Sequence, residues 1–111
     1  MQFLLLIYEN EKRFASGFDP AEMQEYEAFG QQHASVIKSG NALQPTTEAQ
    51  TVRLRNGKAL TTDGPFAETK EQLGGYYLVE ASDKTAAAAM AAKIPGACFG
   101  CVEVRPIMTF S

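Results

Sequence analysis

The chain has 111 residues, of which 45% are hydrophobic and 21% are charged, and this composition is typical of one globular domain spanning residues 1–111. Its ten lysines and arginines are scattered, and the net charge is −3. We therefore expect no phosphate-binding footprint and no direct nucleic-acid partner. An anionic membrane surface is an equally unfavourable partner.

The first predicted element is a strand over residues 2–9, QFLLLIYE. It is apolar almost throughout, which indicates a strand covered on at least one face. Its apolar run, residues 3–8, is too short for the hydrophobic part of a signal peptide and far too short to span a bilayer. We therefore expect a cytoplasmic protein with no membrane partner.

The next predicted element is a helix over residues 20–38. Asp19 can cap its start, Pro20 suits the first helical position, and Gly40 can end it. Apolar and aromatic residues recur at close to helical spacing, at Met23, Tyr26, Phe29, Val36 and Ile37. A short extended piece, NALQPT, follows over residues 41–46.

A β-hairpin is predicted in the middle of the chain. Residues 51–55 and 58–62 flank Asn56-Gly57, a strong two-residue turn signal. Strand alternation places Val52 and Leu54 on one face of this hairpin and the neighbouring arginines on the other.

The last third of the chain predicts strand, helix and strand. Residues 74–81, GGYYLVEA, favour pleated structure. Ser82 or Asp83 caps an alanine-rich helix over residues 84–93, and residues 101–110 form the last strand. Alanines let this helix approach a sheet closely.

This order predicts a ferredoxin-like β-α-β-β-α-β sandwich of the α+β class, with one inserted hairpin. Two helices cover one face of the sheet. No third helix is predicted for the other face, so a second copy of the chain is its natural cover. We therefore expect a homodimer.

The sequence resembles the YCII-related proteins, and in particular their DGPF subgroup. The resemblance lies in DGPF at 63–66, AETKEQLGGYYLVE at 67–80, FLLLIY at 3–8, NALQP at 41–45 and VEVRP at 102–106. It implies a dimeric α+β barrel, in which two ferredoxin-like sheets pack face to face. That fold is similar to muconolactone isomerase and to small antibiotic-biosynthesis monooxygenases.

The resemblance implies less about function. YCII-related proteins are thought to be enzymes because a histidine and an aspartate lie together in a cleft, and DGPF members often accompany extracytoplasmic-function sigma factors. Two departures stand out here. Cys98 and Cys101 occupy positions where DGPF members usually carry other residues, and His33 lies late in its helix rather than near the start.

Asp63 and His33 are the candidate catalytic residues. Asp63 can act as a general acid or base, or it can simply hold the Asp-Gly-Pro turn. His33 can be a proton-transfer group oriented by Asp63, or a half-buried residue on an apolar helix face. Both alternatives stay open for each residue.

The candidate ligand-binding residues are Phe66, Glu68, Lys70, Tyr76 and Tyr77. A lysine at this turn suits an acidic substrate, whereas a solvated loop is the simpler account of residues 68–70. Of the two tyrosines, strand alternation points one toward the helices and the other toward the opposite face. Gly74-Gly75 before them indicates a bulge or a close backbone approach.

No metal or cofactor site is predicted. Cys98 and Cys101 precede a strand rather than a helix, and the chain has no second CxxC pair, so they are expected to be ordinary reduced cysteines. A disulfide-type switch and a metal shared between subunits are the alternatives.

Two functional hypotheses follow. The first is a small-molecule cleft between the sheet and the helices, rimmed by the DGPF segment, for cofactor-free acid–base chemistry of the isomerase or lactone type. The alternative is a non-catalytic ligand-sensing or protein-interaction module linked to sigma-factor regulation, which the resemblance suggests.

Overall fold

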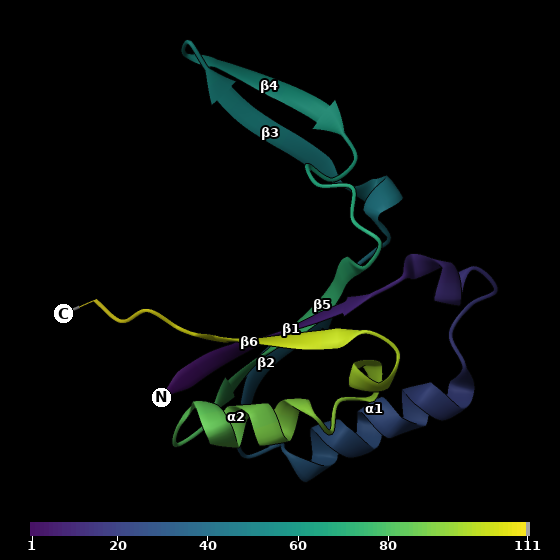
Figure 1. The fold of residues 1–111 in the computed structure, drawn as a ribbon, viewed down its shortest axis with the longest axis vertical. Coiled ribbons are helices and arrows are strands. Elements are labelled where there is room, and N and C mark those ends of the chain that lie inside the picture. The colour runs from purple at the N-terminus through teal and green to yellow at the C-terminus, as the bar shows by residue number, and fades with distance from the viewer. Residues whose placement is uncertain (111) are drawn as a thin grey trace.

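A computed structural model describes residues 1–110 and has a four-stranded antiparallel sheet at its centre (Figure 1). The strand order is β2-β5-β1-β6. The strands are β1 (Gln2–Glu9), β2 (Ile37–Ala42), β5 (Gln72–Glu80) and β6 (Cys101–Pro106). Helices α1 (Pro20–Gln32) and α2 (Lys84–Ala91) lie on the same side of the sheet. The predicted ferredoxin-like α+β fold is confirmed.

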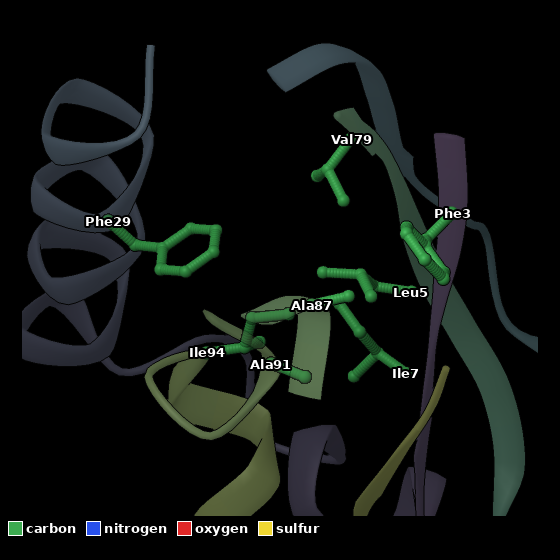
Figure 2. Packing of buried hydrophobic residues seen from close by; sticks show 8 residues of the cluster. All are labelled: Phe3, Leu5, Ile7, Phe29, Val79, Ala87, Ala91 and Ile94. Atoms are coloured by element: carbon green, nitrogen blue, oxygen red, sulfur yellow. The ribbon is translucent and has the colours of Figure 1, made fainter. Parts of the chain in front are cut away.

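Alternation along β1 builds the core between the sheet and the helices. Phe3, Leu5 and Ile7 are buried on the helix side and pack with residues of α1, β5 and α2 (Figure 2). The small Ala87 and Ala91 let α2 approach the sheet, as predicted. The core comprises Phe3, Leu5, Ile7, Phe29, Val79, Ala87, Ala91 and Ile94.

Both helix starts are capped as the sequence predicts. The Asp19 carboxylate accepts a hydrogen bond from the amide of Ala21 at 3.0 Å, and Asp83 accepts one from the amide of Ala86 at 2.8 Å. Of the two candidate caps for α2, the structure therefore selects Asp83. Each cap satisfies a backbone N–H that has no partner within its own helix.

Helix α1 is shorter than predicted. It ends at Gln32, and His33 takes a non-helical φ of −111°. Ile37 instead begins β2 and pairs with Val79 of β5. The predicted helix extension to residue 38 is wrong because pairing with β5 overrides the apolar spacing, and Ile37 is a β-branched residue that suits a strand.

The inserted hairpin forms a two-stranded sheet of its own, made of β3 (Gln50–Arg55) and β4 (Lys58–Asp63). Asn56 and Gly57 both have positive φ, 51° and 75°, as the predicted two-residue turn requires. Figure 1 shows this hairpin standing clear of the main sheet, on the side opposite the helices. Short 3₁₀ helices lie at Glu11–Phe14, Thr46–Glu48 and Pro95–Cys98.

The main sheet has a second face, which we call the open face. It carries the residues that alternate with the core positions, and within residues 1–110 no helix packs on it. Leu4 and Leu6 of β1 lie across from Leu78 and Tyr76 of β5, and all four are only half-buried. An apolar stripe therefore runs along the open face.

A buried charged cluster lies at the end of β1, on the helix side. Glu9 and Glu22 are only 5% and 6% exposed. The guanidinium of Arg13 lies between them, 3.3 Å from the Glu9 carboxylate and 2.8 Å from that of Glu22. One oxygen of Glu9, Oε1, is buried without a partner. Burial raises the pKa of Glu9 above its ordinary value of 4.5, and Arg13 opposes that rise.

This raised pKa predicts a pH effect on stability. The fold favours protonated Glu9, so the residue's contribution is largest below pH 4.5 and is lost as the pH rises through the raised folded pKa. Glu9→Gln removes this loss. We expect the free energy of unfolding, measured in urea at several pH values, to fall less with pH in Glu9→Gln than in the wild type. Free energies of unfolding that fall equally with pH in the two proteins would contradict this prediction.

Candidate functional site

A hollow opens on the open face at the end of the sheet where β1 finishes and β5 and β6 begin. Its volume is about 710 Å³, which lies within the range of small-molecule pockets. Tyr8 and Cys101 supply its floor from paired positions on β1 and β6. The full lining is Tyr8, Asn10, Thr69, Lys70, Glu71 and Cys101.

Tyr8 reaches the hollow because strand alternation points it away from the core, between buried Ile7 and Glu9. Its hydroxyl donates a hydrogen bond to Oε1 of Glu103 at 3.4 Å. Burial and the neighbouring Glu103 carboxylate raise the pKa of Tyr8 above 10. Tyr8 therefore stays protonated near neutral pH and can donate a hydrogen bond.

Cys101 and Glu71 face each other in the same hollow. The Cys101 thiol donates to Oε1 of Glu71 across 3.9 Å. Burial, and then the charge of Glu71, raises the pKa of Cys101 above 9.0. The thiol is therefore poorly suited to act as a nucleophile. Cys98 and Cys101 are both exposed and are not joined by a disulfide.

The rim formed by residues 69–71 is held in place by Gln72, the first residue of β5. The Gln72 side chain donates to the carbonyl of Thr69 and accepts from the amide of Glu11 at 3.1 Å. Glu11 in turn accepts from the amide of Thr46 with both carboxylate oxygens, at 3.1 and 3.0 Å. The rim is thus tied to the first 3₁₀ helix and to the base of the hairpin.

A second, smaller hollow of about 300 Å³ adjoins the first. It shares Asn10, Thr69 and Lys70 with the first hollow, and its remaining lining residues are Glu11, Lys12, Thr46 and Gln72. Two cations, Lys12 and Lys70, and one carboxylate, Glu11, line this hollow, so positive charge is in excess there. An anionic group of a ligand in the larger hollow would be accommodated here.

The structure separates the two predicted catalytic residues. Asp63 ends β4 on the projecting hairpin, where its carboxylate accepts a hydrogen bond from the side-chain amide of Gln50 at 3.5 Å. His33 directly follows α1, and Figure 1 shows α1 on one side of the main sheet and the hairpin on the other. Its Nδ1 lies 3.0 Å from the carbonyl of Phe29, and its ring lies against the Phe29 ring. Within one chain the two residues do not form a catalytic pair.

The turn after Asp63 depends on its glycine. Gly64 has a φ of 94°, its amide donates to Ala49 at 2.7 Å, and its carbonyl accepts from Thr51 at 2.8 Å. The positive φ is sufficient reason for a glycine at position 64, so this glycine does not indicate a ligand site. Phe66 and Glu68 follow as exposed side chains outside the lining of either hollow.

The two tyrosines of β5 point to opposite faces. Tyr77 packs against Phe29 on the helix side, with ring centroids 5.2 Å apart. Tyr76 lies on the open face, and its hydroxyl accepts a hydrogen bond from the side-chain amide of Asn41 at 3.0 Å. Of the predicted ligand-binding residues, the structure places only Lys70 in a hollow lining.

The position of the cleft also differs from the expectation. Core side chains fill the space between the sheet and the helices, and the larger hollow lies on the other face of the sheet. Tyr8 and Glu71 were not among the predicted site residues, and Cys101 was expected to be an ordinary reduced cysteine. Strand alternation was the available signal, because it points Tyr8 and Cys101 away from the core-facing positions of their strands.

Within residues 1–110, no group of three or more histidine, cysteine, aspartate or glutamate side chains is arranged to hold a metal ion. None of the helices in this part of the chain is long and apolar enough to cross a membrane.

Comparisons with known proteins identify relatives of this chain. The family model described as the YCII-related domain matches residues 1–111. An uncharacterised protein of Rhizobium meliloti (strain 1021) is 33% identical over 117 residues, covering 99% of this chain and 94% of the relative.

One similar solved structure is 5-chloro-2-hydroxyhydroquinone dehydrochlorinase of Burkholderia phenoliruptrix AC1100 in complex with 2,5-dihydroxybenzoquinone. It matches with a TM-score of 0.61 and 13% identity, over 97% of this chain and 94% of the other. At this identity the likeness shows a shared fold. Membership of the DGPF subgroup stays a prediction.

Proposed function

Because this chain belongs to the YCII-related family, we propose that it is a small-molecule enzyme whose active site is the hollow on the open face. The observation that carries the proposal is the gathering of Tyr8, Lys70, Glu71 and Cys101 around one cavity of ligand size. Three separate parts of the chain contribute to it, and they bring together a hydrogen-bond donor, a cation, a carboxylate and a thiol.

We propose proton transfer without a cofactor, of the isomerase or lactone type. Glu71 is the general base, because Tyr8 and Cys101 both have raised pKa values and stay protonated. Glu71 takes a proton from the substrate, and the electron pair moves into the conjugated system of the substrate. Lys70 and the Tyr8 hydroxyl stabilise the negative charge that develops on a substrate oxygen. Returning the proton to another atom completes an isomerisation.

The same first step begins an elimination, in which a leaving group departs with its electron pair. The structural neighbour described above is named as a dehydrochlorinase and holds a dihydroxylated quinone. By analogy of fold, we propose a small hydroxylated ring or lactone as the substrate class for this chain.

We also propose that the working form is a homodimer. Leu4, Leu6 and Leu78 form an apolar stripe on the open face beside the hollow, and a second copy packed there would remove this stripe from water. Covering the face would also exclude water from the site, which strengthens electrostatic interactions within it.

The test compares wild type with Glu71→Gln, which keeps the size of the side chain and removes its charge. We expect small hydroxylated quinones, dihydroxybenzoates and unsaturated lactones to raise the melting temperature of the wild type, and one class to be turned over. Glu71→Gln should lower kcat by about 100-fold or more. Asp63→Asn on the exposed hairpin is the matched control and should keep full activity.

Equal turnover in Glu71→Gln and wild type would overturn the catalytic assignment. Binding that saturates at the hollow without turnover would favour the alternative function, a ligand-sensing module. The link to sigma factors and the cytoplasmic location stay predictions from the resemblance and the sequence.

A further inference from the structure

The projecting hairpin, residues 50–63, is called the arm here. An isolated two-stranded sheet is marginally stable in water, and the arm makes no extensive contact with any other helix or strand of residues 1–110. Val52 and Leu54, on one face of the arm, are 64% and 68% exposed. The arm therefore carries an apolar surface that the rest of the described chain leaves uncovered.

A second uncovered apolar segment follows β6. Residues 107–110, called the tail segment here, continue beyond the sheet as an extended chain (Figure 1). The amide of Ile107 still bonds to the carbonyl of Gln2 at 2.9 Å, and the chain then leaves the sheet. Met108 and Phe110 are 74% and 88% exposed.

The arm and the tail segment leave the sheet at opposite ends. The arm is inserted between Ala42 and Gln72, at the end where Gln72 pairs with Glu9. The tail segment leaves at the other end, where Pro106 pairs with Phe3. Figure 1 shows the arm rising from one end and the tail segment leaving from the other. Within one chain the two segments do not meet.

We infer that the arm of one copy binds the tail segment of a second copy. In this arrangement the open faces of two copies pack against each other. The two-fold axis lies between the two sheets and is perpendicular to the strands. The arm end of each sheet then lies over the tail end of the other, and the same contact forms twice. Val52 and Leu54 of one chain pack against Met108 and Phe110 of its partner.

The charges agree with this arrangement. The arm holds Arg53, Arg55 and Lys58, three of the ten basic residues, but only Asp63 of the thirteen acidic ones. The rest of the chain therefore has a more negative net charge than the whole chain. These three basic residues lie on the arm face opposite Val52 and Leu54, so they leave the apolar contact free of charge. Packing that places the two arms at opposite ends of the dimer keeps like charges apart and sets each basic arm over an acidic body.

This inference rests on the homodimer proposed above, so the experiment measures dimerisation and the arm–tail contact separately. Native thiols are removed by Cys98→Ser and Cys101→Ser. Thr61→Cys then places a thiol on the arm face of Val52, its cross-strand partner, and Thr109→Cys places one between Met108 and Phe110. The two kinds of chain, with tags of different size, are co-expressed and treated with a short bis-maleimide, and light scattering measures their mass.

We expect a cross-linked dimer that contains one chain of each kind, and none from either kind alone. Thr85→Cys, on the exposed part of α2, is the matched control and should cross-link to neither. A dimer that gives no mixed cross-link, or Thr61→Cys chains that cross-link to each other, would overturn the arm–tail contact and leave the hollow intact. A monomer at all concentrations would overturn both the dimer and the contact.

A second variant probes the same contact without a thiol. Leu54→Glu should raise the dimer dissociation constant by about tenfold or more, because a charge replaces an apolar contact. The unfolding of the isolated chain should hardly change, since Leu54 is exposed there. Met23→Glu, on an α1 residue that is 53% exposed, is the control and should leave the constant unchanged. Equal constants for Leu54→Glu and wild type would contradict the inference.

Discussion

Replacing Gly100 by alanine should destabilise the protein by at least about 3 kcal/mol, because the added methyl group has no space. Its carbon would lie 1.9 Å from the backbone carbonyl oxygen of Tyr8 and 3.1 Å from the α-carbon of Glu9. Backbone atoms of a central strand cannot move aside as the end of a flexible side chain can. The start of β6 would have to separate from β1, and with it Cys101 from Tyr8.

Urea unfolding of Gly100→Ala and wild type measures this loss. Gly30→Ala is the matched control, since Gly30 lies within α1 and a methyl group there meets no atom within 4 Å. Alanine in a helix should stabilise the protein by up to about 1 kcal/mol. A Gly100→Ala variant as stable as the wild type would mean that β1 and β6 are not held this closely at the hollow.

Replacing Arg13 by methionine should cost about 3–5 kcal/mol at neutral pH. The substitution keeps much of the apolar length of the side chain but removes the charge between two buried carboxylates. Glu9 and Glu22 would then lie close together without a counter-ion. The cation over the Phe99 ring, 3.7 Å from its centroid, would also be lost.

Denaturant titration over a pH series checks this expectation. The deficit of Arg13→Met should shrink as the pH falls, because protonation of Glu9, whose pKa is raised by burial, removes one of the two carboxylate charges left without a counter-ion. Adding Glu9→Gln and Glu22→Gln to Arg13→Met should restore much of the loss at neutral pH. Arg105→Met removes an exposed pair with Glu103 and should cost at most about 1 kcal/mol. Similar costs at Arg13 and Arg105 would contradict the account of the cluster.

Local signals in the sequence were sufficient for most of the fold. The apolar run of β1, the Asn56-Gly57 turn and the Asp83 cap each act through neighbouring residues, and each prediction is confirmed. The glycine pair also behaves as expected. A register shift lies opposite Gly74, and a methyl group on Gly75 would come within 3.0 Å of the Asn41 carbonyl oxygen.

Features set by distant pairing were harder to predict. Ile37 continues the apolar spacing of α1, yet it belongs to β2 because β5 offers it a partner. The hollow depends on a register that places Tyr8 across from Cys101, and on the Gln72 side chain, which bonds to the Thr69 carbonyl and so holds the segment that carries Glu71. A single sequence contains no direct signal for this strand register or for this side-chain hydrogen bond. The DGPF motif drew attention to the correct region, but its own aspartate lies on the arm and only Lys70, Thr69 and Glu71 farther along the chain reach the hollow.

The most direct test of the central claim is an NMR titration of the ¹⁵N-labelled protein with 2,5-dihydroxybenzoquinone and small dihydroxybenzoates. If the hollow on the open face is the ligand site, saturable amide shifts should cluster at Tyr8, Asn10, Cys101 and residues 69–71. The affinity should fall in Tyr8→Phe and Glu71→Gln. Saturable shifts that cluster elsewhere, or no saturable shifts with any of these ligands, would contradict the claim.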